Sequence, residues 1–436
     1  MFKQFLVFIF FFCHLILFSQ SSDIDLKLKA QQEQEKKSEN KKDTLTSDYY
    51  KIFYINGKVE SVDTSLNIYK DYKFNFLRED SFDLISFANS GHTFNKLSYD
   101  LRNYSKPDIG ARGKHFHYFE KEDVGYYNVP TPFTEIFAKS TFEQGQILDM
   151  LVSINLSRQY NFTIAHKGYK SLGKYINTRS RGNQFRFSSN FNSKNQLMYW
   201  RFHFVSQNIF NQENAGIDPD SIYFFEQATD YFVLDDFGNQ IIEDDGSFKM
   251  IEYDGYLDRS RLGPGVFSRG SLYSKRFFSD FQKVLVKNAK NNLNTLAVNY
   301  HFTHEYKKIE YNDEMNNKIF GEVYEIDVVS DQSRFIEQEN KIILSSDLNK
   351  LGLFNLSYSI STWKNNFKIY YEEDSNNLIS KIHEDQSNIK LNWLKKIDLF
   401  NFEFNLNKSS KDDFKLDYIS FKINGSPLRN FDFELN

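Results

Sequence analysis

The stretch that decides the fold is residues 184–207, QFRFSSNFNSKNQLMYWRFHFVSQ. Large apolar residues recur on one parity of the sequence in both of its arms. They are Phe185, Phe187 and Phe191 in the first arm and Met198, Trp200, Phe202 and Phe204 in the second. The residues between them are mostly polar, including Arg186, Arg201 and His203. Because successive residues of a strand point to opposite faces, this pattern predicts two antiparallel strands with one aromatic face and one polar face.

The same alternation recurs at distant places along the chain. It is clear in residues 160–167, 296–304 and 400–407, where Phe, Tyr, Leu, Val and Ile alternate with Asn, Thr, His and Glu. Short polar links such as Arg158-Gln159 join many of these runs, which favours antiparallel hairpins in chain order. A soluble sandwich of two sheets is the alternative, but it would leave the apolar faces of so many long strands uncovered.

Fourteen strands are predicted from this alternation. They span about 66–77, 82–88, 134–142, 146–157, 160–170, 182–192, 196–210, 295–305, 341–347, 352–362, 367–371, 389–394, 399–407 and 414–423. The polar residues Lys364-Asn365-Asn366 are expected to form a turn between two of them. Proline is rare, and none falls between Pro132 and Pro219, as long paired strands require.

The N-terminus has the layout of a secretory signal. Residues 1–20 have a basic start at Lys3, an apolar core and a small residue before the expected cleavage near Ser19 or Gln20. A membrane anchor is the alternative, but the apolar core is shorter than the ~20 residues that a spanning helix needs. Cys13, the only cysteine, lies in this core, so the mature chain is expected to have no disulfide and no thiolate site.

Two further segments interrupt the strand pattern. Residues 21–48 are polar and of mixed charge, and we expect a disordered tail that precedes a barrel domain over 49–436. Residues 212–258 hold many acids against the single base Lys249, which indicates a long external loop of that barrel. A solvated surface loop without a ligand is the simpler interpretation of the acidic segment.

The sequence contains no motif that points to catalysis. His115 and His117 are spaced to share one face of a strand, but two residues do not complete a metal site, so no metal or other cofactor is expected. Nucleophile elbows, phosphate loops and dinucleotide-binding motifs are absent from the sequence, and we expect no enzyme. The net charge of −4 gives no basic surface for nucleic acid.

Several short motifs between Asp63 and Ile217 are shared with one known family. They are FANSG at 87–91, IGARGKHF at 109–116, YYNVPTP at 126–132, EQGQ at 143–146 and NQEN at 211–214. On these motifs the chain resembles the putative porin family of Bacteroidetes, whose members are Gram-negative outer-membrane β-barrels. The resemblance implies location and architecture, and it implies no catalytic residue. Members of the family run longer, and this chain ends at Leu435-Asn436 without a terminal aromatic residue.

Together these observations predict an all-β protein, an antiparallel transmembrane β-barrel of about 14–16 strands in the cell outer membrane. The leading function is a porin that lets small hydrophilic solutes diffuse passively through an aqueous lumen. Five polar side chains are candidates for lining that pore: Arg186, Arg201, His203, Asn299 and Glu403. The alternative is a non-conducting barrel that serves as an adhesin, a secretion accessory or a partner-binding protein.

The expected partners follow from this location. They are the lipid bilayer of the outer membrane, small solutes and the outer-membrane assembly machinery, while the sequence leaves the oligomeric state open. The cargo and the width of the pore are not encoded in any motif.

Overall fold

The structure is a computed structural model, and it describes residues 49–63, 67–87, 89–98, 116–141, 144–218, 222, 233, 235, 237, 239–249, 263–287, 294–313, 329–348, 351–369, 378–397, 400–411, 414–428 and 431–435. The predicted signal peptide, the tail and His115 lie outside these residues, as does most of the acidic segment. The described residues after Tyr49 belong to one compact unit, Tyr50–Asn436. Within the described part of the chain, no helix is long and apolar enough to span a membrane.

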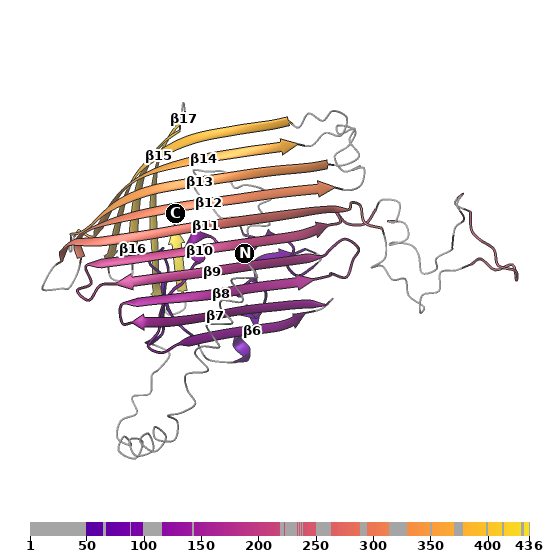
Figure 1. Cartoon of the computed structure of the whole chain (residues 1–436), viewed down its shortest axis with the longest axis horizontal. Helices are drawn as coiled ribbons and strands as arrows, with labels where there is room; N and C mark the ends of the chain where they lie inside the picture. The colour runs from indigo at the N-terminus through magenta and orange to yellow at the C-terminus, as the bar shows by residue number, and fades with distance from the viewer. Residues whose placement is uncertain are drawn as a thin grey trace, which may run out of the picture. The chain divides into compact units, whose positions relative to one another are not determined.

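A single antiparallel sheet of 13 strands dominates this unit, and each strand pairs with the next one in the chain. Figure 1 shows β6 to β14 following one another in order up the picture. The strands are β6 (Phe133–Thr141), β7 (Gly145–Ser157), β8 (Tyr160–Ser171), β9 (Ser180–Asn192), β10 (Met198–Glu213), β11 (Ser268–Lys287), β12 (Asn294–Asp313), β13 (Val329–Asp347), β14 (Leu353–Ile369), β15 (Leu378–Ile397), β16 (Phe400–Lys411), β17 (Phe414–Leu428) and β18 (Phe431–Leu435).

The predicted antiparallel all-β class is confirmed, and the sheet has 13 strands beside the expected 14–16. Among the described residues, β6 and β18 each have one neighbour, and no pairing joins the two strands. Aromatic side chains from successive strands lie next to one another on one face. The ring centroids of Phe187 and Phe202 are 5.3 Å apart, and those of Phe277 and Phe302 are 6.2 Å apart. Such cross-strand contacts help to hold the register of the sheet.

The two faces of the sheet have opposite character, as the alternation predicted. On one face, which we call the outer face, Trp200 is 42% exposed and Ile342 is 52% exposed. On the other face, the inner face, His203 is fully buried and Asp280 is 2% exposed. The sheet therefore exposes apolar side chains and covers charged ones, which is the reverse of a soluble protein.

Several predicted strand boundaries are wrong. β11 escaped detection because Phe277 and Phe278 are adjacent, so that apolar residues fall on both faces and conceal the alternation. Residues 364–366, predicted as a turn, lie inside β14, which is one strand of 17 residues. Strands β13 and β15 extend beyond the predicted ranges because their first halves are mostly polar.

Residues 66–77 were predicted as a strand, and this is also wrong. The 3₁₀ helix η2 (Ile68–Lys73) occupies half of that range. The rest of the N-terminal part forms two small sheets and the 3₁₀ helix η4 (Lys121–Asp123). One sheet has β2 (Val59–Ser61), β1 (Lys51–Phe53) and β5 (Tyr126–Asn128), and the other has β3 (Leu84–Ser86) and β4 (Phe94–Lys96).

This N-terminal part packs on the inner face of the long sheet. Phe76 and Phe94 form a buried cluster with Ile147 of β7 and Tyr169 of β8. The Tyr169 ring lies directly over Gly182 of β9, where a Cβ atom would collide with it. Glycine is therefore required at that position, because it lets the ring lie flat against the backbone of the sheet.

Candidate functional site

The N-terminal part crosses the inner face through residues Phe116–Val129, which we call the inner segment. The segment contains only short elements, η4 and β5, so many of its backbone polar groups need partners from elsewhere. The side chain of Gln207 supplies two of them: it accepts a hydrogen bond from the Phe119 amide and donates one to the Phe119 carbonyl, both at 2.9 Å. Asn190 of β9 donates to the Tyr127 carbonyl at 2.8 Å. Amide side chains of the sheet thus replace the missing backbone partners of the segment.

A buried arginine fixes the middle of the inner segment. Arg276 of β11 is 1% exposed, and its guanidinium donates to the Phe119 carbonyl at 2.7 Å and to Glu305 at 3.1 Å. The Tyr118 hydroxyl lies 2.6 Å from Ser274 and also donates to Glu305. Burial, followed by the charge of Glu305, raises the pKa of Tyr118 well above its ordinary value, so the phenol remains a donor.

A second polar cluster holds the next part of the inner segment. The Tyr126 hydroxyl is 2.9 Å from Nδ1 of His203. Beside it, Nε of Arg201 donates to Asp280 at 2.8 Å, and His301 lies 3.4 Å from the other oxygen of Asp280. The inner segment is therefore held by buried groups from β10, β11 and β12. Removing one member of such a network leaves the others unpaired, at a high cost.

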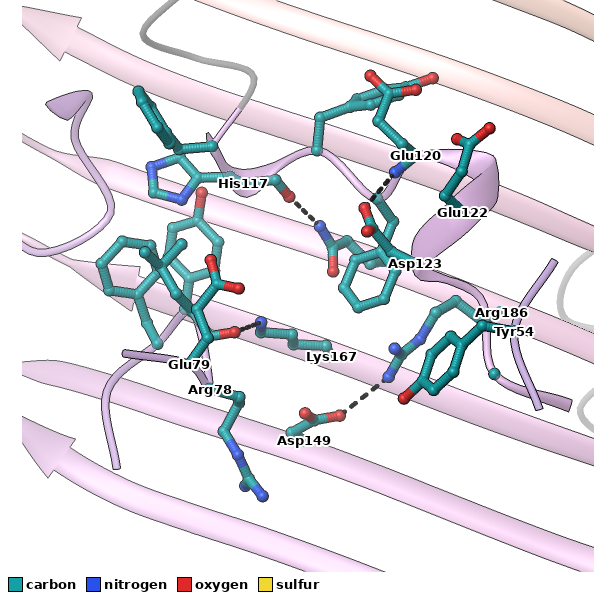
Figure 2. A pocket seen from close by; sticks show the side chains of 18 of the residues that line it. Tyr54, Arg78, Glu79, His117, Glu120, Glu122, Asp123, Asp149, Lys167 and Arg186 are labelled. Atoms are coloured by element: carbon teal, nitrogen blue, oxygen red, sulfur yellow. Dashed lines mark hydrogen bonds and ion pairs between the residues drawn. The ribbon is translucent and has the colours of Figure 1, made fainter. Parts of the chain in front are cut away.

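A cavity of about 900 Å³ separates the N-terminal part from the inner face of β6–β9. Figure 2 shows the carboxylates of Glu120, Glu122 and Asp123 on one side of it and Arg186 with Asp149 on the other. Arg186 bonds Asp149 at 3.2 Å and also stacks on the Phe119 ring, with its guanidinium carbon 4.2 Å from the ring centroid. The volume lies within the range of small-molecule sites in proteins.

His117 lies at the aromatic end of this cavity and not on a strand, contrary to the prediction. It is 5% exposed, and its Nε2 lies 2.7 Å from the carbonyl of His92, so that Nε2 carries the proton. Burial lowers the pKa of His117 to about 4, which keeps the ring neutral. Among the described residues, no group of three or more His, Cys, Asp or Glu side chains is placed to hold a metal ion.

The register of the sheet places the five candidate pore-lining residues on one face, the inner face. Arg186 lines the cavity, and Arg201 and His203 belong to the cluster beneath the inner segment. Asn299 lies on β12, two residues from His301, which is opposite Asp280, and Glu403 lies on β16. Their role in lining a pore stays a prediction.

Sequence reasoning missed the residues that hold the inner segment. Arg276 and Glu305 belong to strands whose polar positions are numerous, and nothing in the sequence distinguishes them from their neighbours. The motif YYNVPTP at 126–132, shared with the family, begins in the inner segment. The shared motif did not indicate that this segment lies against the sheet.

The inner face of the C-terminal strands is of a different kind. Amides there bond one another across β14, β15 and β16: Asn355 donates to Asn392 at 3.2 Å, and Asn392 donates to Asn405 at 2.9 Å. Gln386 donates to Ser409 at 2.6 Å. This ladder is mostly uncharged, and its one carboxylate, Glu403, accepts hydrogen bonds from Asn392 at 2.9 Å and from Asn405 at 3.0 Å.

A sheet with an apolar exposed face and a polar inner face is the pattern of outer-membrane barrels. The family described as "Putative porin" matches residues 46–433, and the chain belongs to that family. Among curated proteins, none matches this chain.

Several solved structures resemble this chain weakly, at very low identity. The ferripyoverdine receptor FpvA of Pseudomonas aeruginosa has 9% identity and a TM-score of 0.44, with 68% of this chain and 40% of the receptor covered. The ferric citrate transporter FecA has 7% identity and a TM-score of 0.45, with 70% and 42% covered. The siderophore receptor PiuA of Acinetobacter baumannii has 9% identity and a TM-score of 0.42, with 69% and 48% covered. The chain thus spans less than half the length of these receptors.

Proposed function

We propose that this protein is an outer-membrane porin that admits small hydrophilic solutes along the inner face of its sheet. Membership of the putative porin family supports this class of function. The polar side chains on the inner face would then line an aqueous passage, and they include the candidates Arg186, Arg201, His203, Asn299 and Glu403. Ionisable groups in such a passage set charge preference without covalent chemistry, so we propose no catalytic step.

The observation that carries the proposal is the reversal of the two faces. Phe277 on the outer face is 41% exposed, whereas Arg276, next to it on the inner face, is 1% exposed. Placing apolar side chains such as Phe277 in lipid removes their exposed area from water, which is worth roughly 25 cal/mol per Å². The same proposal includes two further steps. The predicted signal peptide directs export of the chain, and the outer-membrane assembly machinery inserts it into the outer membrane.

Conductance of the folded protein tests the proposal directly. The full-length mature protein would be refolded in detergent, checked for a heat-dependent shift on a gel and added to a planar bilayer. Stepwise ion currents from the folded species are the expected result. A folded species without currents would overturn the porin function and favour a barrel that does not conduct.

Tryptophan fluorescence tests the orientation of the faces independently of conduction. Trp200 lies on the outer face, and Trp363 lies on the inner face, where it is 6% exposed. Variants that keep only one of the three tryptophans would be refolded into vesicles containing brominated lipid. Strong quenching of Trp200 and weak quenching of Trp363 are expected, and equal quenching of both would contradict a lipid-facing outer surface.

The inner segment favours a second candidate function, a barrel that does not conduct. Contacts from β7 to β13 hold this segment, including the Lys121–Glu339 ion pair at 3.1 Å. A segment held at so many points narrows whatever passage exists. A partner-binding role would then fall to the loops, and it predicts a folded, heat-modifiable protein with no current.

A further inference from the structure

The cavity beneath the inner segment contains basic groups that are nearly all neutralised. Ion pairs neutralise four of the five lysine and arginine side chains that line it. These pairs are Lys58–Glu60 at 2.5 Å, Arg78–Glu135 at 2.6 Å, Lys96–Asp83 at 3.7 Å and Arg186–Asp149 at 3.2 Å. The fifth basic group is Lys167 of β8.

Lys167 is buried without a carboxylate partner. It is 6% exposed, and no carboxylate among the described residues lies within 4 Å of its Nζ. Its one hydrogen bond goes to the carbonyl of Leu77 at 3.5 Å, and the Phe119 ring centroid is 5.7 Å away. An ammonium carries three donors, so most of its bonding capacity is unused. A buried lysine in this condition is costly unless an anion joins it.

Carboxylates line the same cavity, where Figure 2 shows Glu79 and Asp123. Glu79 forms no ion pair with any described residue. Burial, followed by the charge of Asp123, raises the pKa of Glu79. The charge of Lys167 acts on Glu79 in the opposite direction. Both carboxylates face the cavity as hydrogen-bond acceptors, which suits a solute ammonium.

Apolar side chains complete the lining of the cavity. Phe76, Phe94 and Phe116 come from the N-terminal part, and Leu151 and Tyr169 come from the sheet. Aromatic and aliphatic walls with a few polar groups of defined position are the usual composition of a small-molecule site.

We propose that this cavity binds zwitterionic solutes of the amino-acid or short-peptide class, with the solute carboxylate on Lys167 and its ammonium near Glu79 and Asp123. The apolar walls would accept a hydrophobic side chain. This inference rests on the proposed function, in which solutes enter the inside of the barrel, and it names the class that the cavity selects.

Calorimetric titration of the full-length mature protein, folded in detergent micelles, tests the proposal without conduction. The probes are glycyl-phenylalanine, the same dipeptide acetylated at its amine, the dipeptide amide without a carboxylate, and sucrose. Since each blocked dipeptide loses one charge-assisted interaction, we expect it to bind about tenfold more weakly than the free dipeptide, and sucrose not to bind. Equal binding of the free and blocked dipeptides, or no binding of any probe, would overturn the proposal.

Two variants assign the ends of the solute. In Lys167→Met the preference for the free carboxylate over the amide should vanish, while the preference for the free amine remains. In Glu79→Gln the reverse is expected. The matched control is Lys170→Met, which removes an exposed lysine from the outer face of the same strand and should leave all four titrations unchanged. A merely structural role for Lys167 would weaken every probe equally and would overturn the assignment.

The two proposals fail separately. If the folded protein binds the dipeptide but carries no current, the porin function is rejected and the solute site is supported. If the protein carries current but binds the four probes without preference, the porin function is supported and the solute site is rejected. If a variant does not fold, as the heat-shift gel would show, the comparison of probes on the unaltered protein still decides.

Discussion

The inner faces of β8–β12 and of β14–β16 share one geometry but differ in chemistry. The first carries Arg201, Arg276, Asp280 and Glu305 beneath the inner segment. The second carries serines and amides, such as Asn392, that bond one another along the sheet. The alternation of the sequence makes the inner face polar in both regions. Only the charged region, β8–β12, holds the inner segment, and it does so through buried side chains.

The difference follows from what each set of groups needs. Charges removed from water require strong partners, and the backbone and phenols of the inner segment provide some of them. Uncharged amides can satisfy each other across neighbouring strands and remain next to water at low cost. The charged half of the sheet therefore depends on the inner segment, and the amide half does not.

The largest effect is expected from Arg276→Met. This change removes the charge-assisted hydrogen bonds to Glu305 and to the Phe119 carbonyl, each worth about 1.5–3 kcal/mol, while Lys307 stays 3.4 Å from Glu305, so the free energy of unfolding should fall by about 3–5 kcal/mol. Urea unfolding in detergent micelles would measure the loss, and faster tryptic cleavage at Lys121 would report release of the inner segment. Lys275→Met, on the exposed outer face of the same strand, is the control and should change neither quantity. Near-equal results for the two variants would contradict the proposal that the buried charged groups hold the inner segment.

Acidification should loosen the same region through His117. Its pKa in the folded protein is about 4, against about 6.5 in the unfolded chain, so the unfolded state takes up the proton first. Stability is complete above pH 6.5 and falls by about 3 kcal/mol as the pH drops to 4. Urea unfolding at pH 7 and pH 4 would measure this loss.

The control for acidification is His117→Phe, which removes only the histidine contribution. Burial raises the pKa values of Glu79, Glu120 and Asp123, and protonation of these acids adds stability as the pH falls. The difference between the two proteins isolates His117, and parallel pH curves would contradict its role.

A smaller loss is expected from Tyr118→Phe. The variant keeps the ring but loses the hydroxyl that contacts Ser274 and Glu305, while Arg276 still neutralises Glu305. One hydrogen bond to a buried charge is worth about 2 kcal/mol, so the urea midpoint should fall less than in Arg276→Met.

Tyr300→Phe provides the matched control for Tyr118→Phe. It removes a hydroxyl from the exposed outer face, where its partner is Asn340 at 2.7 Å. Its effect on the unfolding midpoint should be small. A loss as large as that of Tyr118→Phe would mean that the buried network adds nothing special.

The smallest effect should come from the amide face. Asn392→Ala removes one member of the ladder between Asn355 and Asn405 and should cost about 1 kcal/mol. Tryptic cleavage at Lys121 should not change, because the inner segment is held elsewhere. Accelerated cleavage in this variant would show that the two halves of the sheet are coupled.

Features that depend on neighbouring residues in the sequence were predicted better than features that depend on residues far apart in it. Strands β7 to β10 were predicted closely because their alternation is regular and their links are short. β11 was missed where Phe277 and Phe278 stand together. The candidate Arg186 lines the cavity, whereas Lys167 fell at the end of the predicted alternation in residues 160–167 without being singled out, and Glu79 was not singled out either.

The sequence by itself determined an antiparallel sheet with one apolar and one polar face, because the direction of a strand side chain depends only on its position along the strand. Only the tertiary structure decided which polar groups meet. Tyr118 reaches Glu305 across 187 residues, a contact that depends on the register of successive strand pairs and on the docking of the inner segment. A local pattern contains neither the accumulated register nor the docking, and the cavity with its unpaired lysine arises from both.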